Sequence, residues 1–113
     1  MILSENEFDR IVKRAIRRIP KEIRKHLKNL LISVQDKPSK KMLIDMDIAL
    51  DGQLLGLFHG TPLTDRSVTS PPLFPDTIYL FQESLEVVCK TKKELEEQIE
   101  ITLVHEIAHF VGM

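Results

Sequence analysis

Three residues near the end of the chain have the types and spacing needed to activate water with a metal ion: His105, Glu106 and His109. On a helix, residues four apart lie one turn apart on the same face, so both imidazoles can bind one Zn²⁺. A carboxylate beside the first ligand can then act as general base toward the water that the metal acidifies. The pattern therefore predicts metal-assisted hydrolysis of a peptide bond, with His105 and His109 as metal ligands and Glu106 as the catalytic base.

The residues around this motif are mostly apolar, which favours a helix that is buried apart from one polar edge. They are Ile101, Leu103, Val104, Ile107, Ala108, Phe110 and Val111. Two histidines and a glutamate on such a helix need polar partners, and one metal ion is the simplest partner for them. In the alternative interpretation, the histidines are hydrogen-bonded core residues and Glu106 faces solvent.

The elements at the start of the chain follow from capping signals and apolar spacing. Ser4 and Glu7 form a capping box that predicts a helix over 5–18, and Pro20 ends this helix and can begin a short second one. Three apolar residues face inward from the second helix: Ile23, Leu27 and Leu30.

Three short apolar runs predict strands over 30–35, 54–59 and 76–81. The stretch 40–52 fits neither the helical nor the strand period, and we expect a short helix or an irregular segment there. The stretch 60–75 is rich in proline and predicts a long loop, and loops of that length are usually functional or disordered.

The C-terminal part of the chain predicts a short helix over 84–89 and then the helix that carries the motif. Thr91 and Glu94 form a second capping box at its start, and Gly112 suits its end because glycine accepts the left-handed cap conformation. The elements together predict a compact α+β domain over 1–113, with a small mixed sheet packed on the N-terminal helices and the motif helix.

The composition is that of an ordinary globular protein of 113 residues, with 42% hydrophobic residues, 29% charged residues and a net charge of −1. No stretch approaches the 20 or so apolar residues that span a bilayer, and the N-terminus lacks the pattern of a secretion signal. We therefore expect a cytoplasmic protein without a membrane partner. The single cysteine, Cys89, has apolar neighbours, which favours a core residue over a reactive thiol.

Charge is distributed unevenly along the chain. The stretch 94–106 contains only acids among its Asp, Glu, Lys and Arg residues, whereas 10–28 contains one acid, Glu22, and many bases. These bases are Arg10, Lys13, Arg14, Arg17, Arg18, Lys21, Arg24, Lys25 and Lys28. An anion-binding module is therefore one alternative function, but no aromatic residues interleave the bases to stack nucleobases. A solvated helix face, without a nucleic-acid partner, is the expectation.

Several segments resemble a known family, the small bacterial zincin-like proteins described as minimal metalloproteases, whose signature is His-Glu-x-x-His-x-x-Gly-x-x-Asp. The resemblance covers nearly the whole chain. It lies in the opening helix and Pro20, in Val34-Gln35-Asp36-Lys37-Pro38, in Leu54-Leu55-Gly56-Leu57-Phe58-His59-Gly60-Thr61-Pro62-Leu63-Thr64-Asp65-Arg66-Ser67, in Pro75-Asp76-Thr77-Ile78 and in the terminal motif. It implies a compact zincin fold, a Zn²⁺ site on His105 and His109, and hydrolysis of a peptide or protein substrate.

The chain departs from the family pattern at the third metal ligand. The family has an aspartate three residues beyond the glycine, which corresponds to position 115, and this chain stops at Met113. Catalytic zinc normally keeps three protein ligands, so we expect that the chain is cut short at its C-terminus. If it is not, another group completes the site, and the candidates are His59, Asp65, Asp76, Glu83 and the terminal carboxylate.

Three further residues are auxiliary candidates. His59 ends the second predicted strand beside the long loop and could line a cleft, Tyr79 could donate a hydrogen bond to an oxyanion, and Arg66 could bind a substrate carboxylate. Each has a structural alternative, as a packed strand residue or as a solvated loop arginine. A protein that keeps the fold and the metal but only binds a partner, and an enzyme that hydrolyses non-peptide amides, remain alternatives. The metal, the substrate preference and the oligomeric state are left open by the sequence.

Overall fold

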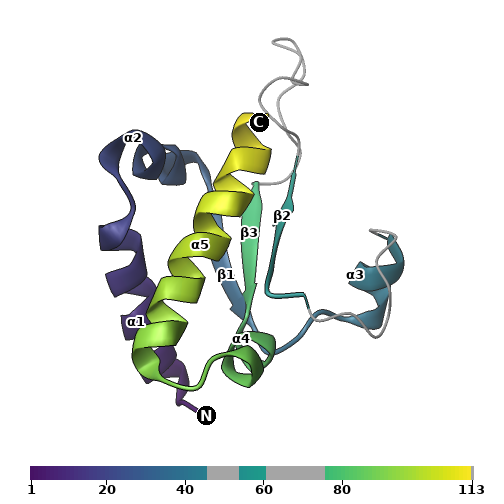
Figure 1. The fold of residues 1–113 in the computed structure, drawn as a ribbon. Coiled ribbons are helices and arrows are strands. Elements are labelled where there is room, and N and C mark those ends of the chain that lie inside the picture. Colours follow the sequence, from purple (N-terminus) through teal and green to yellow (C-terminus); the bar gives the residue numbers. More distant parts are fainter. Residues whose placement is uncertain (46–53, 61–75, 113) are drawn as a thin grey trace.

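The molecule is built from one small sheet with helices on one of its faces (Figure 1). The computed structural model describes residues 1–45, 54–60 and 76–112. Its three strands are ordered β1-β3-β2, and the helices α1 and α5 pack side by side over the sheet. This arrangement confirms the predicted α+β fold, with a mixed sheet packed against an N-terminal helix and the motif helix.

The N-terminal helices begin and end where their capping signals predict. Helix α1 spans Glu5–Arg18, and the Ser4 hydroxyl accepts the N–H of Glu7 at 3.2 Å. Pro20 is the N-cap of α2 (Lys21–Arg24), which continues as the 3-10 turn η1 (Lys25–Asn29). The three apolar residues that were expected to face inward pack in or against the core: Ile23, Leu27 and Leu30.

The strands are each slightly shorter than the apolar runs that predict them. Strand β1 (Leu31–Gln35) pairs in parallel with β3 (Thr77–Phe81), and β2 (Gly56–His59) pairs with β3 in the antiparallel sense. The Phe81 N–H still bonds to the Leu55 carbonyl at 3.0 Å, so pairing continues one residue before the start of β2. Strands β1 and β2 are therefore the two edges of the sheet.

The core lies between the sheet and the two long helices. Along α5 (Lys92–Val111), one apolar side chain per turn is fully buried, and α1 and the sheet present matching apolar residues. The largest of these side chains are Phe8, Ile11, Ile78, Leu80, Leu95, Ile99, Leu103, Ile107 and Phe110. This packing fixes α5 along one face, so the opposite face of its last turns is free to present polar groups.

Two connecting helices complete the described fold. Helix α3 (Lys40–Asp45) matches the expected short helix, and the remainder of 40–52 lies outside the described residues, as does the predicted loop beyond residue 60. Helix α4 spans Gln82–Val88 and begins two residues earlier than predicted. Its N-cap Phe81 offers no capping side chain, and the Asp36 carbonyl instead accepts the Glu83 N–H at 2.9 Å, a tertiary contact that no local signal announces.

Candidate metal centre

The motif occupies the last two turns of α5, a helix that is fixed at both ends. At the start, the Thr91 hydroxyl accepts the Glu94 N–H at 3.1 Å, which confirms the second capping signal. At the end, Gly112 has φ 83°, a left-handed conformation that glycine adopts without steric cost. The positions of the motif side chains are thus set by the rotation of α5 on its core.

The two histidines are open to solvent, whereas the glutamate between them is buried. The side chains of His105 and His109 are 67% and 49% exposed, and that of Glu106 is 7% exposed. The imidazole rings lie on one face of α5 with their centroids 4.7 Å apart. The alternative of core histidines with a solvent-facing glutamate is therefore wrong, because the burial of these side chains is reversed.

Glu106 is held by β2, which is an edge strand of the sheet in the part of the chain that the structure describes. Its Oε1 accepts the N–H of Phe58, on β2, at 2.8 Å. The same oxygen lies 3.3 Å from His109 Nδ1, and Oε2 lies 3.9 Å from His105 Nε2. The buried carboxylate is consequently directed toward the two imidazoles while its remaining acceptor capacity is met by the sheet.

The three side chains suit a divalent cation. One ligand atom from each of His105, Glu106 and His109 can be chosen such that all lie within 4.8 Å of one another. Around a tetrahedral Zn²⁺ with bonds of 2.0–2.1 Å, neighbouring donor atoms are about 3.4 Å apart, so small side-chain rotations bring this group to ligand spacing. Imidazole nitrogens with a carboxylate oxygen are also a donor set that zinc accepts. The residues present therefore fit the metal that the motif implies.

A glycine on β2 allows α5 to lie this close to the sheet edge. A Cβ placed on Gly56 would come within 2.5 Å of the Thr102 methyl carbon and 3.0 Å of the Tyr79 carbonyl oxygen. Thr102 lies one helical turn before Glu106, and Gly56 lies two residues before Phe58. The close contact at Gly56 thus brings the next turn of α5 within hydrogen-bonding distance of Phe58 N–H.

The structure does not bring His59 or Tyr79 to the motif. Residues alternate between the faces of a strand, and Phe58 and Ile78 face the core under α5. His59 and Tyr79 therefore face the opposite side of the sheet, where their ring centroids are 6.4 Å apart, and Tyr79 stacks on Phe81 with an interplanar angle of 7°. This placement favours the packed, structural alternative for both residues.

The other candidate ligands are also separate from the motif or lie outside the described residues. Asp76 is buried against Gly60, where it leaves no room for a Cβ, and Glu83 belongs to α4 at the far end of α5 (Figure 1). Neither joins the cluster of potential ligands in the part of the chain that the structure describes. Asp65, Arg66 and the terminal carboxylate fall outside the described residues.

One group at the site, the backbone N–H of Phe58, is not predicted from the sequence. A strand prediction over 54–59 gives no strand order, so it cannot tell which N–H groups face an open edge. The edge position of β2 and its antiparallel register supply this information. The Leu55 carbonyl accepts a hydrogen bond from β3, so the backbone N–H of every second residue on β2, including that of Phe58, points away from β3. The contact between Phe58 and Glu106 therefore follows from the tertiary structure and not from a local sequence pattern.

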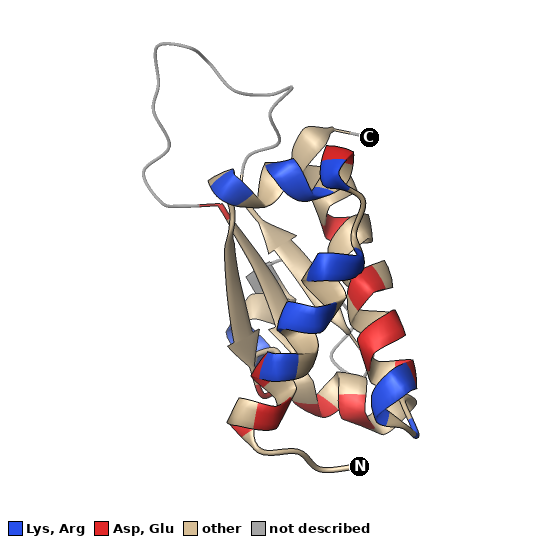
Figure 2. Cartoon of the chain, turned by 90° about the vertical axis from the view of Figure 1, so that its left-hand side faces the viewer, with Lys and Arg blue, Asp and Glu red and all other residues tan. Residues whose placement is uncertain are grey.

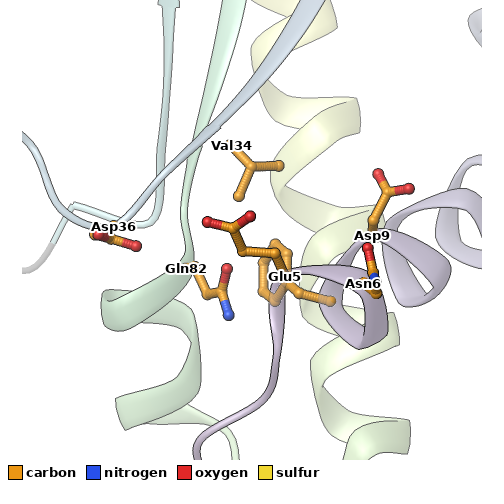
Figure 3. Close-up of a pocket in the computed structure, with 7 residues that line it drawn as sticks. Glu5, Asn6, Asp9, Val34, Asp36 and Gln82 are labelled. Carbon is orange, nitrogen blue, oxygen red and sulfur yellow. The ribbon is translucent and has the colours of Figure 1, made fainter.

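A concave feature lies at the opposite end of the molecule from the motif. A cavity of about 320 Å³ opens between the start of α1, the end of β1 and α4 (Figure 3). Its lining is Glu5, Asn6, Phe8, Asp9, Val34, Asp36 and Gln82. None of the motif residues reaches this cavity, so we do not assign it to the metal centre.

Cys89 is buried, and burial, assisted by the negative charge of Glu94, raises the pKa of its thiol above the ordinary value. This is the behaviour of a core residue rather than of a reactive thiol. Within the described residues, no helix is both long and apolar enough to cross a bilayer.

Comparison with known proteins gives one informative result. A family model described as zincin-like metallopeptidase matches residues 27–113, which is most of the chain. No curated protein sequence matches the chain. The matched stretch includes all three strands and the whole of α5 with its His-Glu-His group, and it begins after α1.

Proposed function

The chain belongs to the zincin-like metallopeptidase family, and on that premise we propose that it is a zinc-dependent peptidase. The single observation that carries the proposal is the convergence of His105, Glu106 and His109 at one point on α5. Family membership supports hydrolysis in general, and this cluster supports a metal-dependent form of it at a defined place on the molecule.

We assign a separate task to each residue of the cluster. His105 and His109, which are open to solvent, hold the zinc ion. When bound, zinc supplies Lewis acidity, which lowers the pKa of water and stabilises negative charge on the carbonyl oxygen. Glu106 accepts a proton from the attacking water and delivers it to the leaving amine nitrogen. The N–H of Phe58 keeps the Glu106 carboxylate in place between these steps.

The substrate class that we propose is a peptide in extended form, bound along the outer edge of β2. This edge is the one beside the motif, since Phe58 on β2 reaches Glu106 directly. Strand addition recognises the peptide backbone and so requires no particular side chain at the cleaved bond. Because Glu106 already engages the N–H of Phe58, the substrate shares this edge with the catalytic base.

A second candidate function is metal binding without catalysis, and one observation favours it. The carboxylate of Glu106 lies within ligand reach of both imidazoles, so Glu106 can complete the site as a third ligand instead of acting as a base. In that case no carboxylate of the cluster would be left to accept a proton from water. The two functions predict different behaviour when the charge of Glu106 is removed.

The variant Glu106→Gln separates the two candidates. A general base contributes to proton transfer but little to metal affinity, so zinc-dependent cleavage of a peptide library should fall by at least about a hundredfold while zinc affinity stays nearly constant. A third ligand contributes to affinity, so its replacement should weaken zinc binding at least about tenfold. Chelator competition and cleavage assays on the same samples measure both quantities.

Glu97→Gln provides the matched control, because Glu97 is on the same helix but outside the cluster. It should leave both zinc affinity and cleavage unchanged. Unchanged cleavage by Glu106→Gln would exclude Glu106 as the base. A wild-type chain that binds zinc tightly but cleaves no member of the library would favour the metal-binding candidate.

A further inference from the structure

Helices α1 and α5 run in the same direction and are joined by a ladder of ion pairs. At one end, Lys92 Nζ lies 3.4 Å from Glu7 Oε2. Further along, Arg14 Nε lies 3.1 Å from Glu96 Oε1, and Arg18 Nη1 lies 3.0 Å from Glu96 Oε2. The bases that seemed to form a solvated face in the sequence are thus partly used to hold the two helices together.

Arg10 interrupts this ladder. It lies three residues after Glu7 and four before Arg14, so it shares their side of α1. Its side chain is exposed, and no ion pair or hydrogen bond joins its guanidinium group to any residue that the structure describes. Across the gap, α5 presents the ammonium group of Lys92, another cation, rather than a carboxylate.

The interruption coincides with a cleft of about 340 Å³ between the two helices. Its lining is Glu7, Arg10, Ile11, Arg14 and Lys92. Three of these side chains are positive and one is negative, and the buried Ile11 forms an apolar floor. Figure 2 shows this side of the molecule, with basic residues along α1 beside the acidic residues of α5.

We propose that this cleft is a binding site for a phosphate group. An anion at this point would pair with Arg10 and complete the ladder, and it would also meet the N–H groups of Arg14 that Glu96 leaves unused. Arginine presents several donors in a planar fork that matches phosphate oxygens, and lysine adds a point charge. The positive end of the 20-residue helix α5 lies at the same place and adds to the attraction.

The size and place of the cleft define the ligand class further. A volume of about 340 Å³ lies within the range of small-molecule sites, so a phosphate ester with a small organic group can be accommodated. Lys92 and His105 are thirteen residues apart on α5, which corresponds to roughly 20 Å along a helix. The phosphate site is therefore separate from the metal centre and does not depend on the peptidase proposal.

The test is titration of the metal-free chain of 113 residues with inorganic phosphate at constant ionic strength, followed by calorimetry. Metal is left out because zinc phosphate is poorly soluble. We expect saturable binding, weakened at least about tenfold by Arg10→Gln and by Lys92→Gln, since each removes a charge-assisted contact. Both side chains are exposed, so neither change should impair folding.

Lys13→Gln is the matched control, because it makes the same charge change on the same helix. Lys13 pairs with Asp9 at 3.1 Å and does not line the cleft, so binding should be retained. Equal weakening by Lys13→Gln and Arg10→Gln would indicate a diffuse basic surface and would overturn the proposal, as would the absence of saturable phosphate binding.

A parallel titration with a short single-stranded oligonucleotide distinguishes the source of the phosphate. A cleft made for one phosphate ester should bind the polymer no more tightly than the free ion. Tight, strongly salt-dependent binding of the oligonucleotide that survives Arg10→Gln would assign the basic residues to a polymer and reject the cleft.

Discussion

Glu106 and its neighbours show how much chemistry the spacing of three residues determines. Positions 105 and 109 must share a face of a helix, and position 106 is rotated by about 100° from the first of them. The sequence therefore predicts the pair of histidines and a glutamate beside them. It does not predict that the glutamate is the buried member, because this depends on Phe58, 48 positions earlier in the chain, reaching it through the sheet edge.

Cys89 leads to a prediction about pH at the residue scale. Burial, and then the charge of Glu94, raises the pKa of its thiol, so the folded state holds this proton more tightly than the unfolded state does. The unfolded chain therefore loses the proton first as the pH rises, and the stability associated with Cys89 is lost above the ordinary thiol pKa of about 8.5.

The prediction is measured by urea unfolding at pH 7 and pH 9.5. The wild-type chain should lose more stability between these values than Cys89→Ala, which has no thiol to titrate. Comparing the pH-dependent change, rather than the absolute stability, removes the constant cost of the smaller side chain. An identical pH dependence in both chains would show that the thiol pKa is the same in the folded and unfolded states.

At the scale of elements, the contact between α5 and β2 is set by one missing side chain. Gly56→Ala should place a methyl group against the Thr102 methyl and the Tyr79 carbonyl, and displace α5 from the strand. We expect the free energy of unfolding to fall by about 1–3 kcal/mol, the usual cost of overpacking. The shift of α5 should also lengthen the hydrogen bond from the Phe58 N–H to the Glu106 carboxylate, so zinc affinity or turnover should fall.

The second-site change Thr102→Ser provides a control for this contact. It removes the methyl carbon that the new Cβ would meet and keeps the hydroxyl that Gln98 contacts at 3.4 Å. The double variant should recover part of the lost stability, with the remainder due to the Tyr79 carbonyl. If Thr102→Ser gives no recovery, the cost of Gly56→Ala arises elsewhere. Urea unfolding of the four chains gives the coupling directly.

Elements that carry their own signals were predicted well, and those defined by tertiary contacts were not. The capping residues Ser4 and Thr91 marked the starts of α1 and α5, and Gly112 marked the end of α5. Helix α4 has no such cap, and its start was misplaced by two residues. Local patterns do not show which face of the sheet packs against α5, which is why His59 and Tyr79 are candidates in the sequence although they face away from the motif.

At the scale of the whole molecule, the charge asymmetry of the sequence acquires a structural role. The basic stretch forms α1 and α2, the acidic stretch forms α5, and Arg14 and Arg18 join the two through Glu96. The hydrogen bond to Glu96 is the main cause that raises the pKa of Arg18 above its ordinary value. Opposite charges that are far apart in sequence therefore lie side by side, whereas Arg10 has no such partner among the residues that the structure describes.

The motif is part of a helix whose other face forms the core, so metal binding should stabilise the whole domain. A ligand that binds only the folded state adds about 2.7 kcal/mol to the free energy of unfolding at one hundred times its dissociation constant. We expect zinc to give an increase of this order, measured by urea unfolding, and His109→Ala to remove it. His26→Gln is the control, since His26 packs on Phe110 with ring centroids 6.4 Å apart and lies outside the ligand cluster. Zinc stabilisation that persists in His109→Ala would place the metal elsewhere, because the proposed site would then keep only one of its two imidazole ligands.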